Sequence, residues 1–244
     1  MTHFPDTRRS LVTAVKSGDG DERARALETL AEAYWRPVYT YVRLKGGLQH
    51  DEAADLTQEF FARLVEKDWL ARFDASRARL RTYLRVLVDG LVANESKARN
   101  RLKRGGGIKV LSLDLEAVRR EVEERRSSGE RSPEDFFERE WVRSVFSLAV
   151  TRLRDRTTAS GQEKRFGVFS AFDLEEAVGS ADARPSYQDL ALRFGMTVVD
   201  VTNQLAAARR DFRRIILDLL RELTVSDAEF RAEARALLGV EPPA

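Results

Sequence analysis

Hydrophobic residues recur at helical spacing along almost the whole chain, and the alternation typical of half-buried strands is nearly absent. The first such pattern runs from Leu27 to Val42, in a helix that we expect to begin near Asp21. Pro37 lies inside it and is expected to kink the helix, and the glycine pair 46–47 is expected to end it. Four aromatic side chains here are compatible with base stacking, but we favour a place in the core: Tyr34, Trp35, Tyr39 and Tyr41.

A second helix is predicted to begin near Asp51, because several acids in its first turns offset the helix dipole. Its apolar face consists of Ala53, Leu56, Phe60, Leu64 and Val65. Its other side carries charged and amide side chains: Asp55, Gln58, Glu59 and Arg63. Taken alone, this side indicates only a solvated helix face.

A long basic helix follows a turn at 72–77, which offers two cap candidates in Asp74 and Ser76. Its apolar side runs from Leu80 to Val92. Its other side carries more polar and cationic residues than dipole compensation needs, which favours contacts with phosphates: Arg79, Arg81, Arg85, Asn94, Lys97, Arg99, Arg101, Lys103 and Arg104. The triple glycine 105–107 follows a helix rather than a strand, so it indicates a helix stop and not a phosphate-binding loop.

The next segment, 108–132, has the composition of a linker, with a dense run of charges. A helix with an apolar face is predicted to start at Ser132–Pro133, where a cap residue precedes a proline and an acid. Phenylalanines between 166 and 172 indicate that part of segment 155–185 packs. We therefore expect an all-α fold of two small helical domains, 1–107 and 133–244, joined by linker 108–132.

The second domain contains a helix-turn-helix pattern. A capped short helix begins at Ser186, Ala191 allows a close crossing, and Gly195 takes the turn before a helix from Val198. A helical hairpin in a core is the alternative. If the second helix enters the major groove, the candidate DNA contacts are Thr197, Asp200, Thr202, Asn203, Gln204, Arg209, Arg210 and Arg213. A last short helix is predicted over 227–238.

Composition narrows the class of protein. The 244 residues contain 34% charged side chains with a net charge of only +2, so nucleic-acid affinity must come from segregated charge. The absence of cysteine excludes disulfides, thiolate metal sites and cysteine nucleophiles. No apolar run is long enough to span a bilayer, so we expect a cytoplasmic protein with no membrane insertion.

Four segments together resemble the extracytoplasmic-function (ECF) type of bacterial RNA polymerase sigma factor. They are Ala-Tyr-Trp-Arg-Pro-Val-Tyr at 33–39, Asp-Leu-Thr-Gln-Glu-Phe-Phe at 55–61, Arg-Ala-Arg-Leu-Arg-Thr-Tyr-Leu at 77–84 and Lys-Arg-Gly-Gly-Gly at 103–107. The resemblance implies a specificity subunit that binds core RNA polymerase, directs it to promoter DNA and helps to open it. It implies no cofactor and no catalytic residue, because the polymerase supplies the chemistry.

The resemblance also assigns roles to segments. Asp55, Gln58, Glu59 and Arg63 would bind the clamp helices of the polymerase. The turn from Phe73 through Asp74 and Ser76 to Arg77 would capture a flipped base of the minus-ten element, and the helix carrying Arg79 to Arg101 would line the DNA. Linker 108–132 would run towards the RNA exit path, and the helix-turn-helix would contact the minus-thirty-five element.

Two departures from the family pattern matter. Family members usually carry a basic residue near Thr202 and others near Ala206 and Ala207, and this chain has none there. The upstream contact is then weak, differently specific, or aided by a partner. The long segment 155–185 either docks an anti-sigma factor or has only a structural role.

Two other classes of protein remain as alternatives. A helix-turn-helix regulator that acts without polymerase would not need the 51–104 segment. A helical-bundle metalloenzyme would need histidines three residues after glutamates, and His3 and His50 do not have that spacing.

Overall fold

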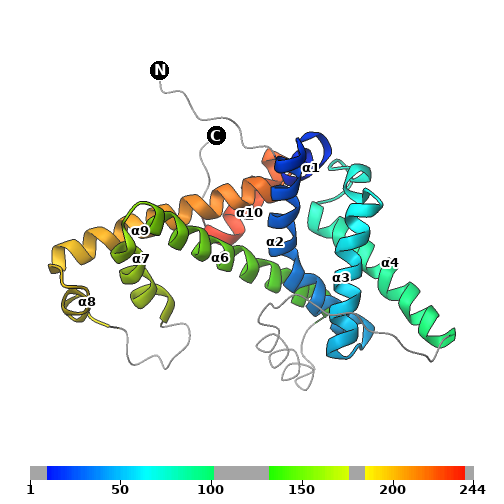
Figure 1. Ribbon diagram of the computed structural model, residues 1–244, viewed down its shortest axis with the longest axis horizontal. Coiled ribbons are helices and arrows are strands. Elements are labelled where there is room, and N and C mark those ends of the chain that lie inside the picture. The colour runs from blue at the N-terminus through cyan, green and yellow to red at the C-terminus, as the bar shows by residue number, and fades with distance from the viewer. Residues whose placement is uncertain (1–9, 102–131, 176–184, 240–244) are drawn as a thin grey trace. The chain divides into compact units, whose positions relative to one another are not determined.

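The computed structural model describes residues 10–101, 132–175 and 185–239, and every regular element in these ranges is helical (Figure 1). The expectation of an all-α fold is therefore confirmed. The linker, the triple glycine, Lys103 and Arg104 lie outside the described residues. The elements are α1 (Leu11–Ser17), α2 (Gly20–Gly46), α3 (His50–Glu66), the 3₁₀ turn η1 (Trp69–Arg72), α4 (Leu80–Arg101), α6 (Pro133–Ala159), α7 (Glu163–Phe169), the π-helical segment η2 (Ser170–Leu174), α8 (Tyr187–Phe194), α9 (Val198–Leu223) and α10 (Asp227–Leu238).

The chain forms two compact units, and their boundaries fall inside α6 and α9. One unit joins residues up to Val145 with those from Leu220 onward, and the other is Phe146–Leu219. This division differs from the expected domains 1–107 and 133–244, because the start of α6 and the whole of α10 belong with α1–α4. The start of α6 packs on α2, where the buried Phe137 ring lies 5.8 Å from that of Tyr41, and the ion pairs described below also join α6 and α10 to α2 and α4.

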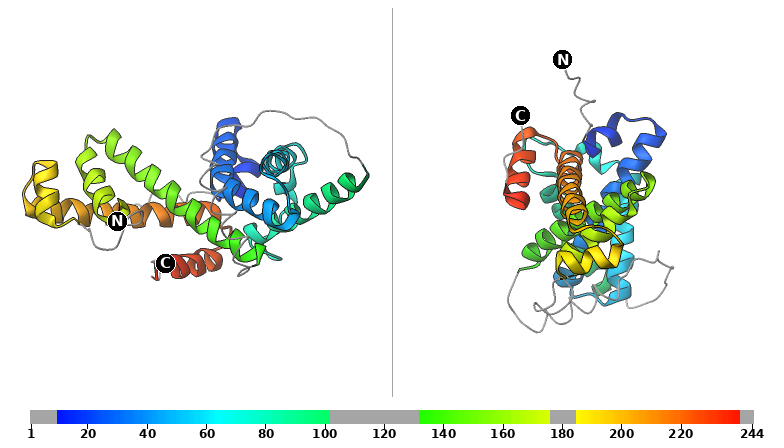
Figure 2. Two further views of the ribbon diagram at one scale, coloured as in Figure 1. Left: turned by 90° about the horizontal axis from the view of Figure 1, so that it is seen from below. Right: turned by 90° about the vertical axis from the view of Figure 1, so that its left-hand side faces the viewer.

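Helices α1 to α4 gather into one bundle, in which α2 contacts α1, α3 and α4 (Figures 1 and 2). Asp19 caps α2 by accepting a hydrogen bond from the Glu22 amide at 2.8 Å. The helix continues through Pro37 and ends where Gly47 adopts φ 59°, a left-handed conformation that favours glycine. The start and end of this helix agree with the sequence prediction.

The three tyrosines of the aromatic stripe of α2 are core, as expected, and Trp35 is half-buried. Tyr34, Tyr39 and Tyr41 are at most 1% exposed, and Trp35 stacks on Phe61 with ring centroids 5.6 Å apart. The Tyr39 hydroxyl lies 2.7 Å from Nδ1 of His50, which gives this buried phenol a polar partner. The three tyrosines are therefore not available for base stacking.

In the second unit, α7 and η2 pack through buried Val168, Phe169 and Phe172. Phe169 lies 5.1 Å from the Phe212 ring of α9. A side chain at Gly167 would place its Cβ 2.7 Å from the Phe194 ring of α8, so glycine permits this close approach. The expectation that segment 166–174 packs is confirmed, and this packing supports the structural alternative for the long segment.

Candidate nucleic-acid and protein interfaces

The outward face of α3 has two kinds of polar side chain. Glu59 and Arg63 form an ion pair with each other one turn apart. Asp55 and Gln58 are exposed, and neither has a hydrogen-bond or ion-pair partner among the described residues. On the inward face Ala53, Leu56, Phe60 and Leu64 are buried as expected. Val65 was expected on that face and is 43% exposed, although the neighbouring Leu64 is buried.

The turn before α4 is closed by its own side chains. Asp74 accepts hydrogen bonds from the Ser76 amide at 2.9 Å and the Ser76 hydroxyl at 2.7 Å. These bonds hold the pKa of Asp74 below its ordinary value. Arg77 pairs with Asp74 at 3.2 Å and stays 85% exposed. The helix begins only at Leu80, so neither Asp74 nor Ser76 caps it, contrary to the sequence prediction.

Phe73 does not lie where a flipped base could stack on it. Its side chain is 5% exposed, and its ring lies 5.2 Å from that of Tyr83. Lys16 donates to the Phe73 carbonyl at 3.1 Å and ties the turn to α1. The Phe73 ring thus belongs to the core of the bundle in this structure, and its contact with a flipped base stays a prediction.

The first two arginines of the basic α4 segment are held by carboxylates of the same unit. Arg79 pairs with Glu233 of α10 at 2.9 Å. Arg81 pairs with Glu233 at 2.7 Å and with Glu138 of α6 at 2.8 Å. The Arg81 guanidinium also lies 4.3 Å from the centre of the Trp141 ring.

Burial makes this Glu233 network different from a surface ion pair. The Glu233 side chain is only 4% exposed and that of Arg81 only 12% exposed. Burial, with a smaller contribution from the Glu233 charge, raises the pKa of the neighbouring Glu229 carboxyl. Arg79 and Arg81 both donate to Glu233 here, and their expected contacts with phosphates stay a prediction. Sequence reasoning missed Glu233, Glu138 and Trp141, since each lies far from α4 in the chain.

The rest of α4 keeps part of its predicted surface. Arg85 is half-buried and Asn94 is exposed. Arg85 has no partner among the described residues. The side chains of Lys97, Arg99 and Arg101 lie outside the described residues, although the helix extends to Arg101.

The helix-turn-helix has the predicted local structure. Ser186 and Asp189 form a capping box at the start of α8. Gly195 adopts φ 59° after Phe194, and the Met196 amide donates to the Ala191 carbonyl at 3.0 Å. Leu190, Ala191, Val201 and Leu205 are buried, as the crossing of the two helices requires. α9 then begins at Val198 as expected.

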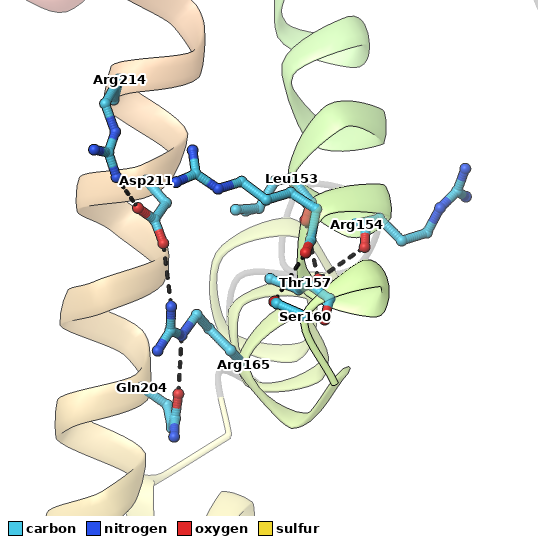
Figure 3. Close-up of polar contacts among 9 residues, drawn as sticks. Leu153, Arg154, Thr157, Ser160, Arg165, Gln204, Asp211 and Arg214 are labelled. Carbon is cyan, nitrogen blue, oxygen red and sulfur yellow. Dashed lines mark hydrogen bonds and ion pairs between the residues drawn. The ribbon is translucent and has the colours of Figure 1, made fainter. Parts of the chain in front are cut away.

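Several polar residues predicted to contact DNA have partners inside the protein. Thr197 and Asp200 bond to each other, with the Thr197 hydroxyl donating at 2.7 Å, so they cap α9. Gln204 accepts a hydrogen bond from Arg165 of α7 at 3.1 Å, and Arg165 also donates to Asp211 at 3.2 Å (Figure 3). Arg209 donates two bonds to Asp173 of η2, at 2.8 and 2.7 Å, which raise the pKa of Arg209.

Other arginines of α9 stay at the surface. Arg210 and Arg213 are exposed and have no partner among the described residues. With Arg209, Arg214 and Leu217 they line an open hollow. The exposed positive charge of these arginines is suited to binding phosphates.

A comparison with protein families decides the identity of the first half of the chain. A family model described as "ECF sigma factor" matches residues 8–138. The chain belongs to the ECF sigma factor family. The match covers α1 to α4 and the first residues of α6, and it stops before the helix-turn-helix. Neither the search of curated proteins nor the search of solved structures found a match.

Membership of the ECF sigma factor family supports a role in transcription initiation, with RNA polymerase and promoter DNA as partners. Sigma factors of this family are regulatory subunits and not enzymes. No described helix has both the length and the hydropathy that crossing a membrane requires. The role of α8 and α9 rests on their own geometry, because the family match ends at residue 138.

Proposed function

We propose that this chain is a cytoplasmic ECF-type specificity subunit that binds core RNA polymerase, directs it to particular promoters and helps to open the DNA. The observation that carries the proposal is the family match over α3 and α4. It is supported by Asp55 and Gln58 on α3, which are exposed and have no partner among the described residues.

In this proposal the outward face of α3 contacts the polymerase. Asp55 is the strongest candidate, because an exposed carboxylate that pairs with no cation of the described residues can pair with a cationic partner surface. Glu59 and Arg63 already pair with each other, so in the interface with polymerase they would contribute contact area and little net charge. We place the minus-ten contacts on Arg77, Arg85, Asn94 and the segment from Lys97 to Arg101, and the upstream contacts on α9.

Binding to purified core polymerase tests the α3 assignment. The variant Asp55→Lys should weaken binding at least about thirtyfold, as expected for a charge reversal at an interface hot spot. The matched control is Glu66→Lys, which makes the same charge change at an exposed position of the same helix and should bind like the wild type. Fluorescence anisotropy of labelled protein against core polymerase measures both.

The outcomes separate the proposed function from its detailed surface. If the wild type binds core polymerase and both Asp55→Lys and Glu66→Lys bind equally well, the assignment of α3 is contradicted while polymerase binding itself stands. No binding of core polymerase by the wild-type chain, with duplex DNA binding preserved, would favour a helix-turn-helix regulator that acts without polymerase.

A further inference from the structure

The first turns of α9 retain few free polar groups, although they are the part of a helix-turn-helix that contacts base edges. Three hydrogen bonds join Thr197 and Asp200. The Thr197 amide and hydroxyl donate to the Asp200 carboxylate at 3.2 and 2.7 Å, and the Asp200 amide donates to the Thr197 hydroxyl at 3.1 Å. These bonds also hold the pKa of Asp200 below its ordinary value. The Thr202 hydroxyl donates to the Val198 carbonyl at 3.0 Å. Three of the side chains expected to read bases are thus occupied locally.

The groups left at this end of α9 are mostly apolar. Val199 is 68% exposed and Val198 is 42% exposed. The Thr202 hydroxyl donates its proton to the backbone, so the methyl group is the part of this side chain left to contact DNA. Asn203 is exposed and has no hydrogen-bond partner among the described residues, which leaves its amide free to donate and accept.

These residues share one face of α9. Val199, Thr202 and Asn203 have the i, i+3, i+4 spacing that places side chains together on a helix. The buried residues Val201 and Leu205 hold the opposite face against the protein. Isolated exposed valines are ordinary on protein surfaces, but here the apolar positions and the one free amide are adjacent.

The same face becomes cationic further along the helix. From Asn203 it continues through exposed Ala206 to exposed Arg210 and Arg213. Arg210 follows Val199 by about 16 Å along the axis, while the major groove of B-DNA is about 12 Å wide. When the first turns lie in the groove, these arginines therefore reach its phosphate border. The face thus matches duplex DNA in both shape and charge.

The side chains on this face of α9 favour particular base pairs. In the major groove the thymine C5-methyl is the apolar group on a base edge, and an asparagine amide pairs in two places with adenine. We infer that Val199, with the methyl group of Thr202, recognises thymine methyl groups and that Asn203 recognises adenine, so that α9 selects A·T pairs upstream. This inference rests on the proposed function only in assuming that α9 binds promoter DNA.

Deoxyuridine tests the inference, because it lacks only the methyl group of thymine. The full chain, bound to core polymerase, selects from a duplex pool randomised over the upstream element and made once with thymine and once with deoxyuridine. We expect enrichment of A·T pairs at one or two positions in the thymine pool. Affinity for the selected sequence should fall about fourfold when the methyl group is removed, as expected for one buried methyl.

Variants of the full chain identify which side chains contact the bases. Val199→Ala should reduce the difference in affinity between the thymine and deoxyuridine duplexes, and Val199→Ala with Thr202→Ser should abolish it, whereas Leu192→Ala should keep the full difference. Leu192 is the matched control, because it is 84% exposed but lies on α8 and not on the base-reading face. Asn203→Ala should lose adenine selection in both pools while methyl sensitivity at the neighbouring pair remains.

Each result decides one of the two proposals. Equal affinity of the wild-type holoenzyme for thymine and deoxyuridine duplexes overturns the inference and leaves the proposed function standing. Undiminished methyl sensitivity in the Val199→Ala, Thr202→Ser double variant overturns the assignment of these two residues as the groups that contact thymine. Methyl-sensitive duplex binding by a chain that forms no holoenzyme supports the inference and contradicts the proposed function, and no upstream duplex binding overturns the inference.

Discussion

The arginines at the start of α4 and those in the second half of α9 look alike in sequence but lie in different environments. Arg81 is 12% exposed and donates to two carboxylates, whereas Arg210 and Arg213 are exposed and border an open hollow. A phosphate can approach the α9 arginines directly. It can reach the buried Arg81 only if the bonds of Arg81 to Glu233 break, whereas Arg79 is half-exposed. A basic run therefore indicates cations, but tertiary contacts decide which of them are available.

The largest expected effect comes from removing the acid that holds the α4 arginines. Glu233→Ala leaves the Arg81 charge buried with only Glu138 as partner, so we expect a loss of about 3 kcal/mol in the free energy of unfolding. Urea unfolding followed by circular dichroism measures it. Glu66→Ala, which removes an exposed acid, should change stability by less than about 0.5 kcal/mol.

A double replacement sharpens this test. Glu233→Leu with Arg81→Met removes both charges and should recover most of the stability lost in Glu233→Ala, because no unpaired charge stays buried. Equal stability of Glu233→Ala and the wild type would show that the Glu233 network does not stabilise the fold. It would then contradict the distinction between the held arginines of α4 and the exposed arginines of α9.

The α9 arginines should affect DNA binding more than folding. Arg210→Ala and Arg213→Ala should each lower the slope of log affinity against log salt by about 0.9, and weaken all sequences alike. Arg209→Ala is the matched control on the same helix, because Arg209 already pairs with Asp173 and should change the slope less. Fluorescence anisotropy of DNA binding across salt concentrations measures these slopes. An equal change at positions 209 and 210 would contradict the distinction between paired and free arginines.

The smallest effect concerns a half-exposed pair that joins α2 to α6. Lys45 donates to Glu134 at 2.9 Å, and this bond lowers the pKa of Glu134 from 4.5 to about 2. A depressed carboxyl pKa stabilises the fold above the unfolded pKa, and that contribution disappears as pH falls from about 4.5 to about 2. The stability difference between wild type and Lys45→Met should therefore be constant above about pH 5.5 and shrink through this window.

Thermal unfolding of both proteins across pH measures this effect. Tyr41 also donates to Glu134, at 3.0 Å, so part of the pKa depression should survive in Lys45→Met. A difference that stays constant down to pH 2 would show that the Lys45 bond does not set the pKa of Glu134.

Local signals in the sequence predicted much of the fold. The helix-turn-helix follows from Ser186, Gly195 and the spacing of Leu190 and Leu205, because caps, left-handed turns and apolar periodicity act within a few residues. The core position of the α2 tyrosines and the bounds of α10 also agree with prediction. The membership of the ECF family follows from short segments along α2 to α4.

The candidate sites were harder to predict, because their chemistry depends on distant partners. Glu233 is far from Arg81 in sequence, and nothing near either residue predicts their pairing. Arg165 and Asp173 likewise engage Gln204 and Arg209 from other elements. The capping box of Thr197 and Asp200 was visible in sequence as the Thr-x-x-Asp spacing, and that spacing could have removed both residues from the base readers.

Run-off transcription with sigma-free core polymerase on a library of genomic fragments tests the central claim most directly. The account predicts discrete new start sites when the purified chain is added, with an upstream element rich in A·T pairs and with loss of those start sites in Asp55→Lys but not in Glu66→Lys. No new start site, from a chain that binds duplex DNA, would contradict the claim that this protein is a promoter-specificity subunit of RNA polymerase.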